Sequence, residues 1–302
     1  MVEFGFRVAL DEAGQRIDKV IARKLPDLGR RAAADLFGKG RVLVDGKAAR
    51  KGDRAQAGAS VTIQLEEGDV EPEPELPLRV VFESPEVAIV RKPAGQPTAP
   101  IRRGETGTLA NAILARFPET RNIGYRAREP GLLHRLDTQT SGLVIVARTP
   151  EAFAKLRTAL AEGRIEKRYL AVVRKDAASE PGVVGQYLAP DPRNPRRVRV
   201  VPATMPGARA ATTRFRTIRV GARWSLLEVH VSHAYRHQIR AHLSWMGAPI
   251  AGDALYGGAL VPALGERQAL HASYVAWAGD DVVPRFEAED PLPVELEALL
   301  SE

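Results

Sequence analysis

The chain reads His134-Arg135-Leu136-Asp137-Thr138-Gln139-Thr140-Ser141-Gly142-Leu143-Val144-Ile145-Val146-Ala147 at its most informative point. The apolar run at the end, residues 143–147, predicts a buried strand, and residues 138–142 have the composition of a turn. Asp137 is therefore expected on a loop anchored by a rigid strand. For an isolated Arg-Leu-Asp triplet, a surface salt bridge between Arg135 and Asp137 would be the simpler interpretation.

The composition is that of an ordinary globular protein with a substantial core. The 302 residues are 44% hydrophobic and 27% charged, which excludes the disordered class. The apolar runs are too short for a membrane span, and the amino terminus lacks a secretory pattern, so we expect a cytoplasmic protein with no membrane partner. Because the chain has no cysteine, any nucleophile must be an oxygen or a nitrogen.

The net charge of +7 is unevenly distributed. Residues 15–65 contain 12 Lys and Arg against 5 Asp, whereas residues 66–75 contain 6 acids and no base. This pattern predicts a small polyanion-binding domain over residues 1–70, a proline-bearing linker over 71–77 and a second domain over 78–302. The alternative is a basic surface that only keeps the protein soluble.

The N-terminal domain shows two helices that lead into a small sheet. Apolar spacing predicts helices over residues 16–25 and 30–37, an Asp-Gly turn predicts a strand pair over 41–49, and alternation predicts a strand over 60–65. Five cations surround the second helix and could neutralise phosphates: Lys24, Arg30, Arg31, Lys39 and Arg41. The pattern resembles the S4 RNA-binding module, an α/β domain, although Gly29-Arg30 replaces its usual Ser-Arg helix entry.

The second domain contains many strand-like runs and few helices. Hairpin-length links separate most of these runs, which favours an α+β domain with a mixed, mainly antiparallel sheet over a doubly wound one. Helices are predicted over residues 108–117, 152–161 and 237–246. We therefore expect one large domain built on a single sheet.

Three motifs of this domain resemble, in order, those of RNA pseudouridine synthases of the RluA type. Residues 134–143 match the motif of the catalytic aspartate, His-Arg-Leu-Asp followed by two variable residues and Thr-Ser-Gly-Leu. Lys167-Arg168-Tyr169 matches the active-site tyrosine motif, and residues 237–240 read His-Gln-Ile-Arg, as in the third motif. The Lys-Pro-Ala-Gly loop at residues 92–95 also matches the start of that domain. The resemblance implies the pseudouridine synthase fold.

The resemblance also implies the roles of single residues. Asp137 would be the catalytic carboxylate, Tyr169 would hold the detached base, and Arg240 would pair with Asp137. Arg135 would fill the space that a flipped nucleotide vacates, and the remaining RNA contacts would come from His134, His237 and Gln238. The isomerisation needs no metal and no redox cofactor, because one ionised carboxylate can serve as nucleophile or base.

Some features depart from the family or allow other interpretations. Residues 233–236 read His-Ala-Tyr-Arg where the family has Thr-Gly-Arg before the residue that precedes His-Gln, so the arginine is shifted by one place. His233 and His237 are four residues apart, as in some metal sites, but no glutamate follows in a zincin arrangement. Four arginines between residues 193 and 199 could track an RNA backbone or lie in a solvated loop.

These observations predict an enzyme that converts uridine to pseudouridine in structured RNA. Large-subunit ribosomal RNA is the expected partner, transfer RNA is a second possibility, and a monomer is expected. A non-catalytic RNA-binding assembly factor is the first alternative. A glycosidase is the second, although such enzymes need two carboxylates on one bond.

Overall fold

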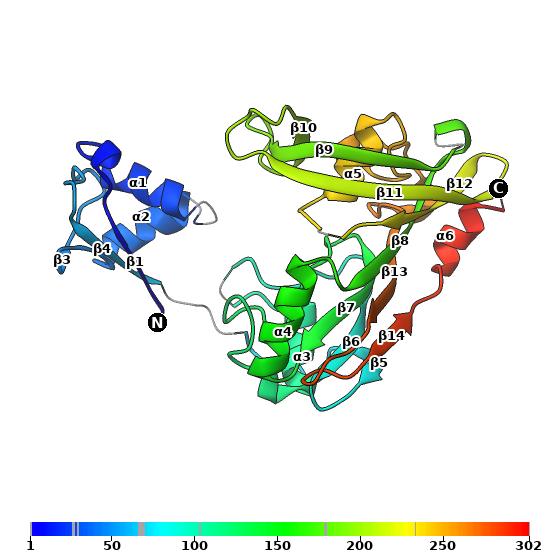
Figure 1. Cartoon of the computed structure of the whole chain (residues 1–302), viewed down its shortest axis with the longest axis horizontal. Helices are drawn as coiled ribbons and strands as arrows, with labels where there is room; N and C mark the ends of the chain where they lie inside the picture. The colour runs from blue at the N-terminus through cyan, green and yellow to red at the C-terminus, as the bar shows by residue number, and fades with distance from the viewer. Residues whose placement is uncertain are drawn as a thin grey trace. The chain divides into compact units, whose positions relative to one another are not determined.

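The computed structural model divides the chain into two compact units, Met1–Gly68 and Asp69–Glu302, which we call the N-terminal and the C-terminal unit. It describes residues 2–25, 28, 30–65, 70–102, 104–177, 180–232 and 234–301. Figure 1 shows the elements of both units. In the described ranges, the helices are too short to cross a lipid bilayer.

The N-terminal unit packs two helices on an antiparallel sheet with the strand order β1-β4-β2-β3. Val20, Ile21 and Val61 are among the fully buried residues of its core. Both predicted helices are present, and β1 is a strand that the sequence analysis missed. The bounds are β1 Val2–Arg7, η1 Leu10–Glu12, α1 Ile17–Lys24, α2 Arg30–Gly38, β2 Val42–Val44, β3 Lys47–Ala48 and β4 Ser60–Leu65.

The C-terminal unit is built on one long sheet with the order β10-β9-β11-β12-β8-β13-β7-β6-β5, and β14 pairs with β13. Among the strand pairs of the described residues, only β13 and β7 run parallel. The sheet is therefore mixed and mainly antiparallel, as predicted. Its strands are β5 Arg79–Glu83, β6 Val87–Lys92, β7 Ser141–Ala147, β8 Glu166–Arg174, β9 Gly182–Pro190, β10 Val198–Val201, β11 Arg209–Val220, β12 Trp224–His230, β13 Leu270–Trp277 and β14 Phe286–Glu289.

Helices cover both faces of this sheet (Figure 1). In β7, Val144 and Val146 pack in the same core cluster as α3, whereas Leu143 and Ile145 pack in the cluster of α4. Burial on both faces explains why β7 is an unbroken apolar run. The helices are α3 Leu109–Arg116, η2 Pro118–Thr120, α4 Pro150–Ala161, η3 Lys175–Ala177, α5 Gln238–Trp245, η4 Ala254–Tyr256, η5 Pro262–Leu264 and α6 Val294–Leu299.

The stretch predicted as a linker, residues 71–77, is held against α3. The side-chain amide of Asn111 donates to the carbonyl oxygen of Glu71 at 2.8 Å, and the carboxylate of Glu73 accepts from the Gly107 backbone at 2.6 Å. Val70 is buried in the core of the C-terminal unit. These contacts explain why the division between the units falls before residue 69 rather than after residue 70.

Candidate active site

The loop that carries Asp137 is fixed by its own backbone and by Thr98. The backbone N–H of Thr140 donates to the carbonyl oxygen of Asp137 at 2.9 Å, which closes the predicted turn. The Thr98 hydroxyl donates to the carbonyl oxygen of Leu136 at 2.6 Å and accepts from its N–H at 3.2 Å. Since Leu136 is buried, the residue before Asp137 has little freedom.

Lys92 clamps the same loop from the end of β6. Its ammonium group donates to the carbonyl oxygens of Pro93, Gln96 and Thr138 at 2.8, 2.8 and 3.0 Å. Burial lowers the pKa of Lys92 to about 7, while the negative charge of Asp137 acts in the opposite direction. The Lys-Pro-Ala-Gly motif therefore has a structural task here, because its lysine joins two loops at the residue after Asp137.

A third set of contacts comes from the residues just before β13. Gln268 donates to the Thr140 hydroxyl at 2.9 Å, and Arg267 donates to the Ser141 hydroxyl at 2.6 Å. Gly142 has φ +117°, and a side chain there would collide with the carbonyl oxygen of Ala272 in β13. Only glycine therefore permits the close parallel approach of β7 and β13.

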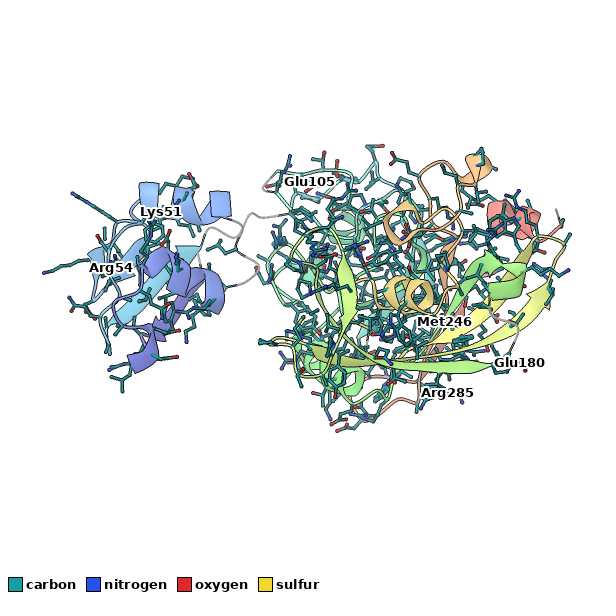
Figure 2. The ribbon with its side chains drawn as sticks, turned by 90° about the horizontal axis from the view of Figure 1, so that it is seen from above. Lys51, Arg54, Glu105, Glu180, Met246 and Arg285 are labelled. Atoms are coloured by element: carbon teal, nitrogen blue, oxygen red, sulfur yellow. The ribbon has the colours of Figure 1, made fainter. Side chains whose placement is uncertain are left out.

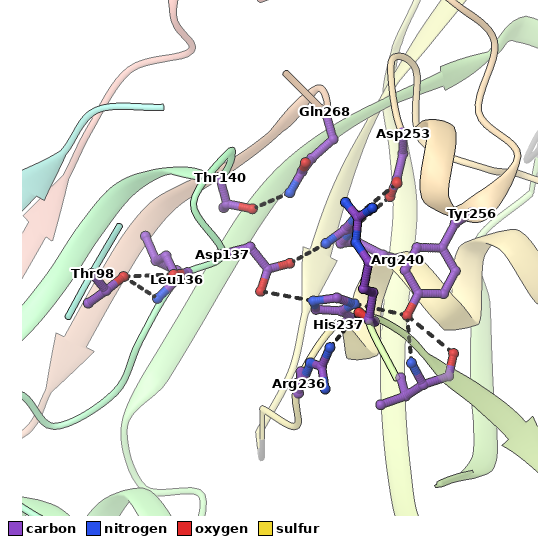
Figure 3. Close-up of polar contacts among 12 residues, drawn as sticks. Thr98, Leu136, Asp137, Thr140, Arg236, His237, Arg240, Asp253, Tyr256 and Gln268 are labelled. Atoms are coloured by element: carbon purple, nitrogen blue, oxygen red, sulfur yellow. Dashed lines mark hydrogen bonds and ion pairs between the residues drawn. The ribbon is translucent and has the colours of Figure 1, made fainter. Parts of the chain in front are cut away.

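The Asp137 carboxylate pairs with a guanidinium group that is itself fixed (Figure 3). Arg240 Nη1 donates to Asp137 Oδ2 at 2.7 Å, and its Nε and Nη2 donate to the two oxygens of Asp253 at 2.7 and 2.8 Å. The side chains of Asp137, Arg240 and Asp253 are 26%, 9% and 1% exposed. Burial by itself would lower the pKa of Arg240, but the two carboxylates raise it, so the cation beside Asp137 is permanent.

His237 faces the other oxygen of Asp137. Its Nε2 lies 3.7 Å from Asp137 Oδ1, and its Nδ1 lies 3.0 Å from the hydroxyl oxygen of Tyr256. The Tyr256 ring packs edge-on against His237 with centroids 5.7 Å apart and lies 5.0 Å from the Arg240 guanidinium. Burial lowers the pKa of His237 to about 4, which keeps the imidazole neutral near pH 7.

Tyr169 and Asp137 line one cavity. Tyr169 lies on β8 and is 6% exposed, and burial together with the charge of Asp137 raises its pKa above the ordinary value. The phenol is therefore neutral in the free protein. Eight residues contribute the polar and aromatic part of the lining: Arg135, Asp137, Thr140, Tyr169, Tyr235, His237, Gln238 and Arg240.

Three predicted RNA contacts have different surroundings. Arg135 is exposed at the cavity, where it pairs with Glu129 at 2.9 Å. His134 accepts from the backbone N–H of Ile145 at 3.3 Å, and burial lowers its pKa to about 3, so its ring is tied to β7. Gln238 is 2% exposed, and its amide bonds Thr212, Thr213 and Tyr235. Protein contacts therefore already use the amide of Gln238.

The predicted cations of the N-terminal unit lie in and around α1 and α2. Lys24 pairs with Glu12 at 3.2 Å, and Lys39 pairs with Asp35 one helical turn away at 2.8 Å. Arg41 directly precedes β2. The side chains of Arg30 and Arg31 lie outside the described part of the structure.

Part of the segment that departs from the family pattern, residues 233–236, can be followed in the structure. His233 lies outside the described residues. The Arg236 guanidinium donates to the carbonyl oxygen of Pro195 at 3.0 Å and to that of Arg196. The shifted arginine therefore supports the turn between β9 and β10.

Sequence reasoning missed Asp253 and Tyr256 as parts of the site. Both follow α5 in the segment Gly252-Asp253-Ala254-Leu255-Tyr256-Gly257. An aspartate after a glycine and a tyrosine before a glycine form no periodic pattern that points to Arg240 or His237. The only available signal was their place after the His-Gln-Ile-Arg motif.

The cavity combines a carboxylate, a fixed guanidinium group and an aromatic ring, an arrangement typical of the active site of an enzyme. Asp137 is partly exposed in a cavity, Arg240 donates to its carboxylate, and the ring of Tyr169 lies in the same cavity. Residues 86–245 match the family model described as RNA pseudouridylate synthase. The chain belongs to the RNA pseudouridine synthase family.

Known relatives agree with this family over nearly the whole chain. An uncharacterized RNA pseudouridine synthase of Chloroflexus aurantiacus is 36% identical, covering 96% of this chain and 90% of the relative. The ribosomal large subunit pseudouridine synthase D of Xanthomonas campestris pv. campestris is 34% identical, covering 96% and 89%. The structure of human RNA pseudouridylate synthase domain containing 1 has a TM-score of 0.59 at 24% identity, covering 76% and 91%, and shows the shared fold.

Proposed function

We propose that this enzyme converts uridine to pseudouridine in large-subunit ribosomal RNA, with Asp137 as the catalytic carboxylate. The observation that carries the proposal is the 2.7 Å pair of Asp137 and Arg240 in a cavity that Tyr169 also lines. The choice of RNA rests on the name of the Xanthomonas relative, a ribosomal large subunit enzyme. Transfer RNA is the alternative substrate.

The reaction breaks the bond between N1 and C1′, rotates the uracil, joins C5 to C1′ and removes the C5 proton. Asp137 could attack the ribose, attack C6 of the base or abstract the C2′ proton. All three routes begin with an ionised carboxylate, and the adjacent Arg240 favours that form. Because Asp253 holds the guanidinium by two further bonds, the charge is in place before the substrate arrives.

Tyr169 is suited to hold the uracil while it is detached. Its ring offers a flat apolar surface in the cavity, and the raised pKa keeps the phenol protonated, so that it is not itself ready to accept the C5 proton. In the route through C6, Asp137 is still esterified when C5 joins C1′, so its charge no longer contributes to the raised pKa at the step that removes the C5 proton.

Arg135, which lines the cavity, is our candidate for the contact with the RNA that surrounds the flipped uridine. A uridine in a paired region must leave its stack to reach Asp137. The Arg135 side chain is 61% exposed and joined to the protein by the bond to Glu129. The Glu129 side chain is only 6% exposed, so moving the guanidinium into the vacated space would leave a buried carboxylate without this partner. Contacts with the RNA would have to offset that cost.

The N-terminal unit supplies the second contact with RNA in this proposal, as an S4-like domain. Its two helices and small sheet are consistent with that module, and Lys24, Lys39 and Arg41 lie in and around α1 and α2. Figure 2 shows Lys51 and Arg54 on the same unit, and both are exposed. Cations of this kind contribute sequence-independent affinity for phosphates.

The site is less suited to the glycosidase alternative. Hydrolases of that class place a second carboxyl group beside the bond that breaks. The second aspartate near Asp137 is Asp253, whose side chain is 1% exposed and fully engaged with Arg240. We also propose action as a monomer, in which Asp137, Tyr169 and Arg240 of one chain suffice for the chemistry. We place the enzyme in the cytoplasm, where ribosomal RNA would be available to it.

The test is the substitution Asp137→Asn. We expect it to abolish tritium release from a large-subunit ribosomal RNA transcript labelled at C5 of uridine, while RNA affinity stays near the wild-type value. Asp281→Asn is the matched control, because the Asp281 side chain is 82% exposed. Turnover by the Asp137 variant at a rate near wild type would refute the proposal, and so would an inactive protein whose RNA affinity is also lost.

A further inference from the structure

The side chain of His237 does not contribute to the helix that it precedes. His237 is the N-cap of α5 with φ 53° and ψ 19°, and its side chain makes no capping bond. A non-glycine residue in the left-handed region carries a conformational cost. His237, the residue with this cost, lies one turn before Arg240, and its side chain is 11% exposed and lines the cavity.

The contacts of the His237 imidazole favour one of its two neutral tautomers. Its Nδ1 meets the hydroxyl of Tyr256 at 3.0 Å, and its Nε2 faces Asp137 Oδ1 at 3.7 Å (Figure 3). A carboxylate repels a nitrogen lone pair and attracts an N–H, so Asp137 favours the tautomer with the proton on Nε2. In that tautomer Nδ1 is an acceptor, which suits the Tyr256 hydroxyl.

Tyr256 is itself held in place. Its hydroxyl oxygen accepts from the backbone N–H of Val198 at 3.0 Å. The one hydroxyl proton has two acceptors within reach, the carbonyl oxygen of Val198 at 3.2 Å and Nδ1 of His237 at 3.0 Å, and the tautomer with the proton on Nε2 requires that it goes to Nδ1. Val198 begins β10, at the edge of the sheet. The ring is 7% exposed and also packs on the Arg240 guanidinium. The Tyr256 hydroxyl thus connects the imidazole to strand β10.

We propose that His237 and Tyr256 are positioning residues for Asp137, in which Nε2–H of the imidazole restrains Oδ1 while Arg240 restrains Oδ2. This inference rests on the proposed function of Asp137. The carboxylate would be held at both oxygens, so that its orientation toward the substrate does not depend on Arg240 alone. The 3.7 Å separation would shorten when substrate excludes water from the cavity.

The test compares two amides at position 237. The side-chain nitrogen of glutamine reaches about as far as Nε2, whereas that of asparagine reaches only as far as Nδ1. Asparagine also tolerates the left-handed backbone. We expect His237→Asn to lower the single-turnover rate roughly ten- to hundredfold, as for loss of a hydrogen bond to a charged group. We expect His237→Gln to recover much of that loss.

Affinity and controls separate positioning from a structural role. RNA affinity of both variants, measured with the same ribosomal transcript, should equal that of the wild type. Tyr256→Phe should lower the rate less than His237→Asn. His230→Asn is the matched control, because His230 lies on β12 with its ring against Glu228 at 3.1 Å, and its rate should not change.

Several results would overturn the inference. A wild-type rate for His237→Asn would do so, as would a loss confined to RNA affinity, which would make His237 an RNA contact, or equal rates for the Asn and Gln variants. Nitrogen NMR of the imidazole in the full chain gives a readout that does not depend on activity. A proton on Nδ1 instead of Nε2 would refute the inference, whether or not the wild type forms pseudouridine. A wild type that forms no pseudouridine would instead refute the proposed function.

Discussion

The substitution Arg240→Lys tests the electrostatic core of the site. It keeps the positive charge but removes the planar group that binds two carboxylates at once. Arg240 makes three bonds of 2.7 to 2.8 Å to Asp137 and Asp253. A lysine ammonium cannot reproduce the paired bonds to Asp253 and also reach Asp137.

The expected magnitude follows from these contacts. Asp253 is buried, and leaving one of its oxygens without a charged donor costs about 2 to 3 kcal/mol, so the free energy of unfolding should fall by that amount. If weaker positioning of Asp137 removes about 2 kcal/mol of transition-state stabilisation, the rate falls roughly thirtyfold.

Urea denaturation and single-turnover tritium release measure the two effects. Arg285→Lys is the control, because its side chain is 74% exposed and pairs only with Glu287 among the described residues. An Arg240→Lys variant with wild-type stability and rate would show that charge alone, and not the guanidinium geometry, maintains the site.

Three further predictions concern the loop, the buried histidines and the N-terminal unit. Gly142→Ala should lower the free energy of unfolding by at least about 2 kcal/mol, because the methyl group meets the Ala272 carbonyl; a small change in the urea midpoint would contradict this. Burial lowers the pKa values of His242 and His271 from 6.5 to about 4. The unfolded chain therefore binds more protons between these values, and the urea midpoint should fall as the pH is lowered from about 6.5 to about 4; a flat profile would count against it. Removing residues 1–68 should weaken RNA binding and reduce its salt dependence, and an unchanged slope would show that this unit does not contact phosphates.

The sequence predicted the elements whose patterns are local. β7 was visible as an apolar run, and α4 was visible from Thr149-Pro150 at its start, where the Thr149 hydroxyl does accept from Ala152. The motifs also identified Asp137, Tyr169 and Arg240, which the structure brings to one cavity. Their catalytic roles stay predictions.

Elements that depend on distant partners were not predictable in this way. β13 contains buried polar residues such as His271 and Ser273, which hide its strand character. His271 is accommodated by Ser141 at 2.8 Å and by the carbonyl oxygen of Asp290 at 3.1 Å. The contact of Asp253 with Arg240 is likewise visible only in the structure.

The parallel pairing of β7 with β13 has a consequence for how the enzyme is made. Residues 141 and 142 pair with residues 271 and 272, and Arg267 and Gln268 complete the support of the Asp137 loop. A nascent chain on the ribosome lacks this support until almost all of it has been synthesised. The enzyme thus becomes competent late, when β13 inserts between β7 and β8, and translation products that end before this strand should be inert toward RNA.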